Sequence, residues 1–199
     1  MEQRVWLYID YQNVHLSVRE AFAPPGTPHH LTLIHPSKYG DALMARRKAK
    51  GRGGVLEQIH VYRGQPSSDR EATSASRNKA QSAEWSRDPR LTMYNRPLRY
   101  PRNWPSIPAR EKGVDVKLAL DFVRAAVDGS ADVLILASRD TDLVPALESA
   151  SDLGKADLEV VTWSGCSRVR FGGSYSARPL WCTFMEGGDY VASKDPKPY

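Results

Sequence analysis

The sequence predicts an α/β protein with a mostly parallel central sheet. Short segments rich in β-branched and aromatic residues alternate along the chain with helical patterns, as in proteins built from strand–helix–strand units. One segment, VLILAS at 133–138, is continuously apolar, which is typical of a strand buried on both faces. The 199 residues, 41% of them hydrophobic and 26% charged, suffice for one substantial domain. We expect that domain to span 1–185 and a polar tail to follow at 186–199.

The first half of the chain contains three expected strands and three expected helices. The strands are expected at 4–9, 55–63 and 90–100, and the helices at 12–22, 37–50 and 67–87. Pro24 and Pro25 end the first helix, and Pro97 places the third strand at a sheet edge or a bulge. The segment 30–36 fits more than one structure, and 101–110 is a proline-rich loop.

The second half repeats the alternation more clearly. Helices are expected at 113–128 and 141–152, and strands at 133–138, 158–163 and 180–185. Gly129 and Gly154 follow the two helices, as is common at helix ends. The loop 164–178 is rich in Gly, Ser and Arg, and it suits either the border of a site or a homodimer contact.

Composition excludes several classes of protein. No stretch approaches the ~18 consecutive apolar residues that a membrane helix needs, so we expect no membrane partner. The N-terminus reaches acidic and polar residues too early for a secretory signal. The two cysteines, Cys166 and Cys182, cannot form a disulfide framework or a four-cysteine zinc site, and we expect a cytoplasmic protein.

The charge is unevenly distributed along the chain. Residues 41–110 hold fifteen Lys and Arg against six Asp and Glu, a net charge of +9, whereas residues 111–199 hold ten against fourteen, a net charge of −4. A basic segment indicates a polyanionic partner. The acidic residues suit either a solvated surface or metal ligands.

Acidic residues directly follow two of the expected strands. Asp10 comes after the first strand, and Asp140 and Asp142 come after the strand at 133–138. In an open parallel sheet, ligands bind outside the carboxyl ends of the strands. We therefore expect these carboxylates to project from one edge of the sheet.

A fourth carboxylate, Asp115, is placed by helical periodicity. At about 100° per residue, Leu118, Phe122 and other apolar residues lie on the same face of the helix 113–128 as Asp115. The solvated face is expected to contain Lys117, Asp121, Arg124 and Asp128. Asp115 is therefore expected on the buried face, in the first turn of the helix.

Carboxylates that converge from three segments repel one another unless a cation lies among them. We expect Mg²⁺ or Mn²⁺ at Asp10, Asp115, Asp140 and Asp142. Asn13 is placed to orient a carboxylate or a metal-bound water. Taken singly, each residue has another interpretation, because an Asp after a strand also caps helices and Asp115 also suits an ion pair with Arg110 or Lys112.

Three blocks of the sequence resemble the signature blocks of the NYN domain, a branch of the PIN-like ribonuclease superfamily that includes the LabA-like bacterial proteins. The blocks are YIDYQNVH at 8–15, EKGVDVKLALDFV at 111–123 and LILASRDTDLVPAL at 134–147. The resemblance spans 4–163, and KGVD is its most distinctive element. It implies a Rossmann-like three-layer α/β/α sandwich and RNA cleavage that depends on Mg²⁺ or Mn²⁺.

The resemblance also assigns roles to single residues. It places the acidic site at Asp10, Asp115 and Asp140, with Asp142 as a fourth carboxylate and Asn13 as the supporting amide. The glycine that usually precedes the acidic residue of the third block is Arg139 here, a cation suited to a substrate phosphate or to an acidic neighbour. We expect an endoribonuclease in which water attacks the phosphodiester directly.

The basic middle segment is the expected RNA-binding surface. Its densest cluster lies at 46–52, next to three glycines. Phosphate contacts from such a cluster predict binding that weakens steeply with salt. The expected RNA-binding residues are Arg46, Arg47, Lys48, Lys50, Arg52, Lys112 and Arg139.

Other functions remain open at this point. One alternative is a catalytically weak or inactive RNA-binding or adaptor protein with the same fold. A DNA nuclease is another, because the chemistry does not distinguish the sugars. A phosphatase that uses Asp10 as nucleophile is disfavoured, because Gln12 stands where such enzymes usually have a second Asp.

Overall fold

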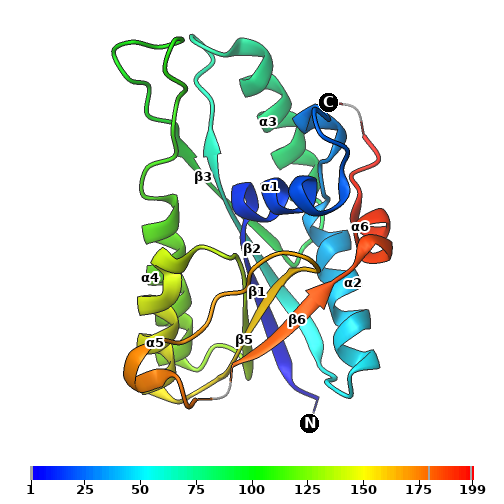
Figure 1. The fold of residues 1–199 in the computed structure, drawn as a ribbon, viewed down its shortest axis with the longest axis vertical. Coiled ribbons are helices and arrows are strands. Elements are labelled where there is room, and N and C mark those ends of the chain that lie inside the picture. Colours follow the sequence, from blue (N-terminus) through cyan, green and yellow to red (C-terminus); the bar gives the residue numbers. More distant parts are fainter. Residues whose placement is uncertain (1, 179, 198) are drawn as a thin grey trace.

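The computed structural model describes residues 2–178, 180–197 and 199; positions 1, 179 and 198 of the expected domain and tail lie outside the described residues. It contains a six-stranded sheet with the order β3-β2-β1-β4-β5-β6, in which every neighbouring pair is parallel. Helices cover both faces (Figure 1). The prediction of a three-layer α/β/α sandwich is confirmed.

The elements follow the predicted alternation with small shifts at their ends. The strands are β1 (Arg4–Asp10), β2 (Val55–Gln65), β3 (Leu91–Pro97), β4 (Val133–Ala137), β5 (Asp157–Trp163) and β6 (Trp181–Met185). The α-helices are α1 (Tyr11–Phe22), α2 (Pro36–Ala49), α3 (Ala72–Trp85), α4 (Val114–Asp128), α5 (Val144–Leu153) and α6 (Gly187–Ser193). Short 3₁₀ helices are η1 (His29–Leu31), η2 (Thr141–Leu143) and η3 (Gly173–Tyr175).

The strand order reverses between β1 and β4. From β1 the chain moves outward through β2 to β3, and it then returns to place β4 on the other side of β1. The loops after β1 and β4 therefore diverge and leave a crevice at the carboxyl edge of the sheet, where ligands bind in folds of this class.

Two apolar cores fill the space between the layers. On one face, strand residues pack with α1, α2, α6 and the end of α3, where Trp85 is fully buried. On the other face, Phe122 of α4 and Leu147 of α5 are fully buried against the sheet. Figure 1 shows α4 and α5 on one side of the strands and α1, α2 and α6 on the other.

Helix α4 is rotated about its axis relative to the expectation. Its outward face carries Val116, Leu120 and Val127 in addition to charged residues. Asp121, expected in solvent, is half-buried because it accepts hydrogen bonds from the Tyr62 hydroxyl (2.8 Å) and the Lys117 ammonium. The rotation leaves Asp115 half-buried at the rim of the core-facing side.

Of the expected polar tail at 186–199, the described residues 186–197 and 199 include a helix and an aspartate that pack against the folded body. A capping box between Glu186 and Asp189 starts α6, which packs against α2. Tyr190 is buried there and stacks on Phe22. Asp195 then accepts a 2.7 Å hydrogen bond from the indole of Trp85. The segment is polar on average, but its few apolar and acidic residues have specific partners.

Candidate active site

Carboxylates from three separate segments meet at the carboxyl edge of the sheet. Asp10 is the last residue of β1, Asp140 follows β4, and Asp115 lies in the first turn of α4. They share a hollow of about 260 Å³, which we call the acidic pocket. Its lining residues are Asp10, Gln12, Asn13, Leu16, Glu111, Val114, Asp115 and Asp140.

Asp10 is the most buried of these carboxylates. Its Oδ1 atom accepts a hydrogen bond from the backbone N–H of Asn13 (3.2 Å), and its Oδ2 atom accepts one from the Ser138 hydroxyl (3.0 Å). Burial nevertheless raises the pKa of Asp10 to about 7, and the negative charges of Glu111 and Asp140 add to the rise. The two hydrogen bonds therefore stabilise the ionised Asp10 carboxylate less than water would.

Hydrogen bonds hold the loops after β1 and β4 in register with one another. The Asn13 side-chain oxygen accepts from the backbone N–H of Arg139 (3.0 Å). The Ser138 hydroxyl oxygen accepts from the N–H of Asp140 (3.1 Å) while its proton is donated to Asp10. Asn13 and Ser138 thus position Asp10 and Asp140 relative to each other.

Glu111 is a fourth carboxylate of the acidic pocket that the sequence reasoning missed. Its Oε1 atom accepts a hydrogen bond from the backbone N–H of Gly64, at the carboxyl end of β2. A side chain at Gly64 would place its Cβ 2.8 Å from the Glu111 Cγ, so the contact requires glycine. Burial raises the pKa of Glu111, and the charge of Asp115 adds to this. Glu111 lies four residues before Asp115, and this spacing is the feature of the sequence that could have indicated it as a site residue.

Asp142 does not line the acidic pocket. Its side chain is exposed, and its backbone N–H donates a 2.9 Å hydrogen bond to Oδ1 of Asp140. The second acidic residue of the DTD sequence therefore lies beyond the turn that Asp140 caps. Of the four expected carboxylates, the structure brings together Asp10, Asp115 and Asp140.

The pocket carboxylates lack cationic partners. Within the described ranges, no Lys, Arg or His forms an ion pair with Asp10, Glu111, Asp115 or Asp140. In the same part of the chain, no group of three or more His, Cys, Asp or Glu residues has the geometry to hold a metal ion.

Arg139 and Lys112 take different positions around this pocket. The Arg139 guanidinium is directed to Glu20 on α1, with which it forms an ion pair, and it does not line the acidic pocket. Lys112 is exposed and lines a neighbouring hollow together with Arg99 and Arg110. Glu111 borders both hollows, so Lys112 lies in a hollow that adjoins the acidic pocket.

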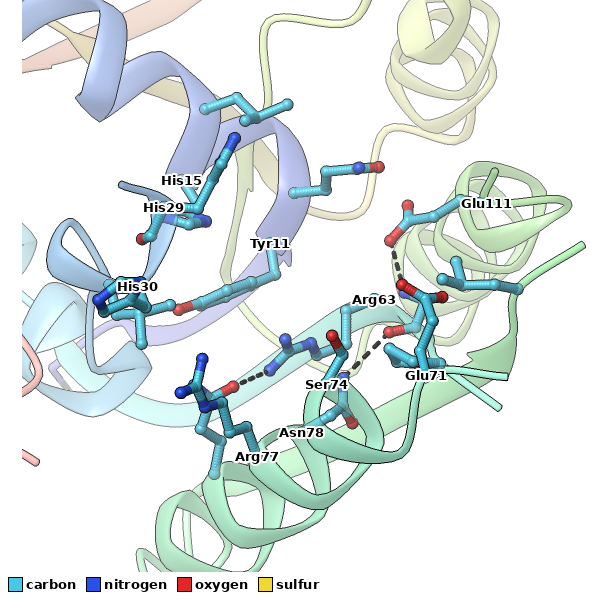
Figure 2. Close-up of a pocket in the computed structure, with 17 residues that line it drawn as sticks. Tyr11, His15, His29, His30, Arg63, Glu71, Ser74, Arg77, Asn78 and Glu111 are labelled. Atoms are coloured by element: carbon cyan, nitrogen blue, oxygen red, sulfur yellow. Dashed lines mark hydrogen bonds between the residues drawn. The ribbon is translucent and has the colours of Figure 1, made fainter. Parts of the chain in front are cut away.

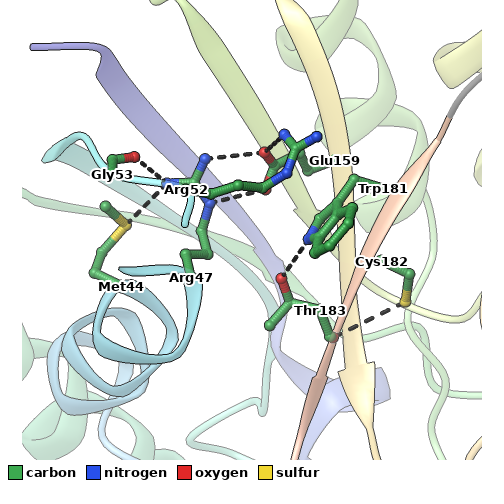
Figure 3. Close-up of polar contacts among 8 residues, drawn as sticks. All are labelled: Met44, Arg47, Arg52, Gly53, Glu159, Trp181, Cys182 and Thr183. Carbon is green, nitrogen blue, oxygen red and sulfur yellow. Dashed lines mark hydrogen bonds and ion pairs between the residues drawn. The ribbon is translucent and has the colours of Figure 1, made fainter. Parts of the chain in front are cut away.

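The basic cluster 46–52 lies at the opposite edge of the sheet, where α2 ends and β2 begins. Arg47 is fully buried and binds Glu159 through two hydrogen bonds of 2.8 and 2.9 Å (Figure 3). Arg52 also binds Glu159 and stacks on Trp181, 4.4 Å from its ring centroid. The expectation that Arg47 contacts RNA is corrected, because the buried carboxylate of Glu159 requires this cation inside the protein.

The remaining members of the cluster are divided. Arg46 forms ion pairs with Glu186 and Asp189 beside α6, at 3.1 and 2.6 Å. Lys48 and Lys50 are exposed. None of the cluster residues lines the acidic pocket, so its positive charge does not surround the carboxylates. The Arg-rich stretch 168–178 also stays outside this pocket, and Arg178 in it pairs with Asp152 of α5 at 2.9 Å.

Comparison with known proteins supports the fold and the family. A solved structure, a protein of unknown function from Vibrio parahaemolyticus RIMD 2210633, superposes with a TM-score of 0.52 at 16% identity, covering 91% of this chain and 93% of that chain. At this identity the likeness shows the fold alone. No curated protein matches significantly. In the described part of the chain, no helix is both long and apolar enough to cross a membrane.

The match to a family model is more specific. The NYN domain model matches residues 4–165, which include all three sequence blocks and every carboxylate of the acidic pocket. With most of its length matched, the chain belongs to the NYN domain family.

Proposed function

We propose that this protein is a ribonuclease that hydrolyses RNA phosphodiester bonds with Mg²⁺ or Mn²⁺ at the acidic pocket. One observation carries the proposal. Three carboxylates from β1, α4 and the turn after β4 face one pocket without cationic partners, and burial raises the pKa of the innermost one, Asp10. Such an arrangement destabilises the empty protein, and a hard divalent cation relieves the repulsion.

The donor set fits this metal. Asp10, Asp115 and Asp140 would hold it, because all three line one pocket and offer the carboxylate oxygens that Mg²⁺ and Mn²⁺ prefer. When bound, the cation supplies Lewis-acid stabilisation of the charge that develops on a phosphodiester. The chain's own contribution is positional, since Ser138 and Asn13 fix Asp10 and Asp140 at the switch point of the sheet.

Glu111 and Lys112 lie where an RNA strand would pass the pocket. Glu111 is half-buried, and burial raises its pKa, so it is placed to exchange a proton with an attacking water or a leaving oxygen. Lys112 is exposed beside it and can bind a phosphate oxygen. Both belong to the block that contains Asp115.

A nuclease assay on single-stranded RNA, structured RNA and single-stranded DNA, with Mg²⁺, Mn²⁺ or EDTA, tests the proposal. We expect cleavage of RNA that EDTA stops and that Asp115→Asn lowers at least about 100-fold, since one of three anionic donors is lost. Asp128→Asn changes an exposed carboxylate on the same helix and serves as the matched control. Equal activity in Asp115→Asn and wild type, or cleavage that persists in EDTA, refutes the assignment.

The alternative, an RNA-binding protein of the same fold without turnover, is favoured by the spacing of the carboxylates. Within the described residues they form no ready metal-holding group. This function predicts RNA binding in EDTA and no cleavage with either metal. The same assay, combined with a binding measurement, therefore separates the two functions.

A further inference from the structure

A second, larger pocket adjoins the acidic pocket and contains a half-buried cation. Its volume is about 430 Å³, within the range of pockets that bind small ligands. It shares Gln12, Leu16 and Glu111 with the acidic pocket. We call it the Arg63 pocket (Figure 2). Its other polar lining residues include Tyr11, His15, Arg63, Ser74, Arg77 and Asn78.

Arg63 is held rigidly but lacks an acidic partner. Its guanidinium lies over the rings of Tyr11 and Trp85, 4.8 and 5.3 Å from their centroids. Its Nη1 atom donates a 2.9 Å hydrogen bond to the side-chain oxygen of Gln81. Among the described residues, no carboxylate lies within ion-pair distance of it. Burial disfavours its charged form, so the fold keeps a desolvated cation whose remaining N–H donors face the pocket.

The strand register places this cation next to the catalytic edge. In the pairing of β1 with β2, Asp10 lies opposite Tyr62, and Arg63 is the next residue of β2. Arg63 therefore lies one residue beyond the end of β1 but still within β2, where it pairs with Asn95 of β3. Its side chain lies on the side of α1 and α3, where it contacts Tyr11 and Gln81, while Asp10 lines the acidic pocket. A chain that crosses Glu111 and Gln12 passes from one pocket into the other.

We propose that the Arg63 pocket binds an internal phosphodiester of single-stranded RNA, next to the bond that lies at the acidic pocket. This rests on the proposed function, which supplies the RNA. A guanidinium fork matches two oxygens of a phosphate, and a pre-positioned fork loses little side-chain entropy on binding. Arg77 and Ser74 are exposed on α3 at the same pocket, where they offer a second cation and a hydroxyl donor.

The shape of the pocket selects a flexible strand. Phosphates of a duplex lie on a convex, rigid surface and do not reach a recessed guanidinium, whereas a single strand can bend into the hollow. His15 lies in the same wall. Its Nε2 atom is 3.0 Å from the backbone oxygen of His29 and 2.9 Å from the Thr32 hydroxyl, and burial lowers the pKa of His15 to about 4. It is therefore neutral at pH 7. Arg63 and Arg77 supply the positive charge of the pocket, which Glu71 and Glu111 also line, and the Glu71 carboxylate accepts a hydrogen bond from the Tyr100 hydroxyl.

The test measures RNA binding in EDTA, so that neither the metal nor cleavage enters. The probe is a fluorescently labelled single-stranded 10-nucleotide RNA with a 5′-hydroxyl, followed by anisotropy at several salt concentrations. We expect Arg63→Met to raise the dissociation constant at least about tenfold and to reduce the slope of log binding constant against log salt by about 0.7, the value for one single-strand phosphate contact. Arg77→Met should weaken binding in the same direction by about threefold.

Lys155→Met removes an exposed cation just before β5, at the opposite edge of the sheet, and is the matched control that should change neither quantity. Because Arg63 stacks on two aromatic rings, a folding defect in Arg63→Met is checked by its thermal melt. If the variant does not fold, Arg77→Met decides, because Arg77 is exposed. Three results overturn the proposal: unchanged binding by folded Arg63→Met, an equal loss in Lys155→Met, or unchanged binding by Arg77→Met when Arg63→Met is unfolded.

Two further arms separate the possible sources of phosphate and the two proposals. The same RNA with a 5′-phosphate should show the same loss in Arg63→Met; a loss confined to the 5′-phosphorylated RNA identifies a terminal-phosphate site and overturns the assignment to an internal phosphodiester. If binding falls in Arg63→Met but wild type cleaves nothing with Mn²⁺, the subsite stands and the nuclease proposal fails. If wild type cleaves RNA but Arg63→Met binds it normally, the nuclease proposal stands and the proposed phosphodiester site at Arg63 fails.

Discussion

Replacement of Asp10 by Asn should stabilise the metal-free protein. Asp10 is buried at the end of β1 without a cationic partner, and its pKa of about 7 shows that the fold disfavours its ionised form. The introduced amide keeps an oxygen that accepts from the N–H of Asn13 and gains an N–H that donates to the Ser138 hydroxyl oxygen. The substitution therefore removes the buried charge while it preserves the hydrogen-bond geometry.

The size and the pH dependence of the effect follow from the pKa. A rise from 3.8 to about 7 corresponds to at most about 4 kcal/mol, at about 1.4 kcal/mol per pH unit. Water in the acidic pocket reduces this to about 2 kcal/mol. Below pH 4 both folded and unfolded states hold the proton, so the difference is zero. Between pH 4 and 7 the Asp10 carboxyl ionises only in the unfolded state, so wild type loses stability relative to Asp10→Asn as the pH rises. Above pH 7 the carboxyl is ionised in both states, and the difference is constant.

The assay is urea unfolding of wild type, Asp10→Asn and Asp128→Asn in EDTA, from pH 4.5 to 8.5. Asp10→Asn should exceed wild type in unfolding free energy by about 2 kcal/mol at pH 8 and by little at pH 4.5. The exposed Asp128 should give less than about 0.5 kcal/mol at every pH. A repeat with Mg²⁺ or Mn²⁺ at ten times its dissociation constant should raise wild-type stability by about 1.4 kcal/mol and leave Asp10→Asn unchanged.

A lower stability of Asp10→Asn than of wild type at pH 8 in EDTA would refute this reasoning. It would mean that the Asp10 carboxylate stabilises the fold through its hydrogen bonds and is not an unfavourable charge kept for a ligand. A difference that does not vary with pH would show that the effect is one of packing. Either result would also weaken the argument that the acidic pocket is built for a cation.

Two further predictions concern residues outside the acidic pocket. Arg47→Met should destabilise the protein by about 3–5 kcal/mol in urea unfolding, because it leaves the buried Glu159 with only the half-exposed Arg52, and a loss below about 1 kcal/mol would contradict the structural role given to Arg47. His60→Phe should stabilise the protein by about 1–2 kcal/mol more at pH 4.5 than at pH 7.5. The His60 pKa is lowered to about 4, so below pH 6.5 the unfolded state takes up a proton that the folded state refuses; an equal effect at both pH values would exclude this cause.

Periodicity and strand-end position predicted the parts of this protein that depend on local sequence. The alternation of apolar strands with helices predicted the parallel α/β sheet, and the position of Asp10 and Asp140 after their strands placed both at the carboxyl edge of that sheet. Helical periodicity was less exact for α4. Lys117 and Asp121 look like surface charges in the sequence, but they pair with each other, and Tyr62 of β2 binds Asp121. That contact rotates the helix, and it depends on a residue more than fifty positions away.

The cationic residues show why charge density along a chain is a poor guide to its binding surface. Arg46, Arg47 and Arg52 crowd together in the sequence, yet each forms an ion pair with an acidic residue more than one hundred positions later. Their charge is neutralised inside the fold, and only Lys48 and Lys50 of that cluster remain exposed. Arg63 is isolated in the sequence, at the end of a predicted strand, and among the described residues it forms no ion pair, although its charge acts on that of Glu111 nearby. A polyanion can bind strongly only to cations that the fold leaves without acidic partners. Which cations these are depends on tertiary contacts, such as the pairing of Arg47 and Arg52 with Glu159.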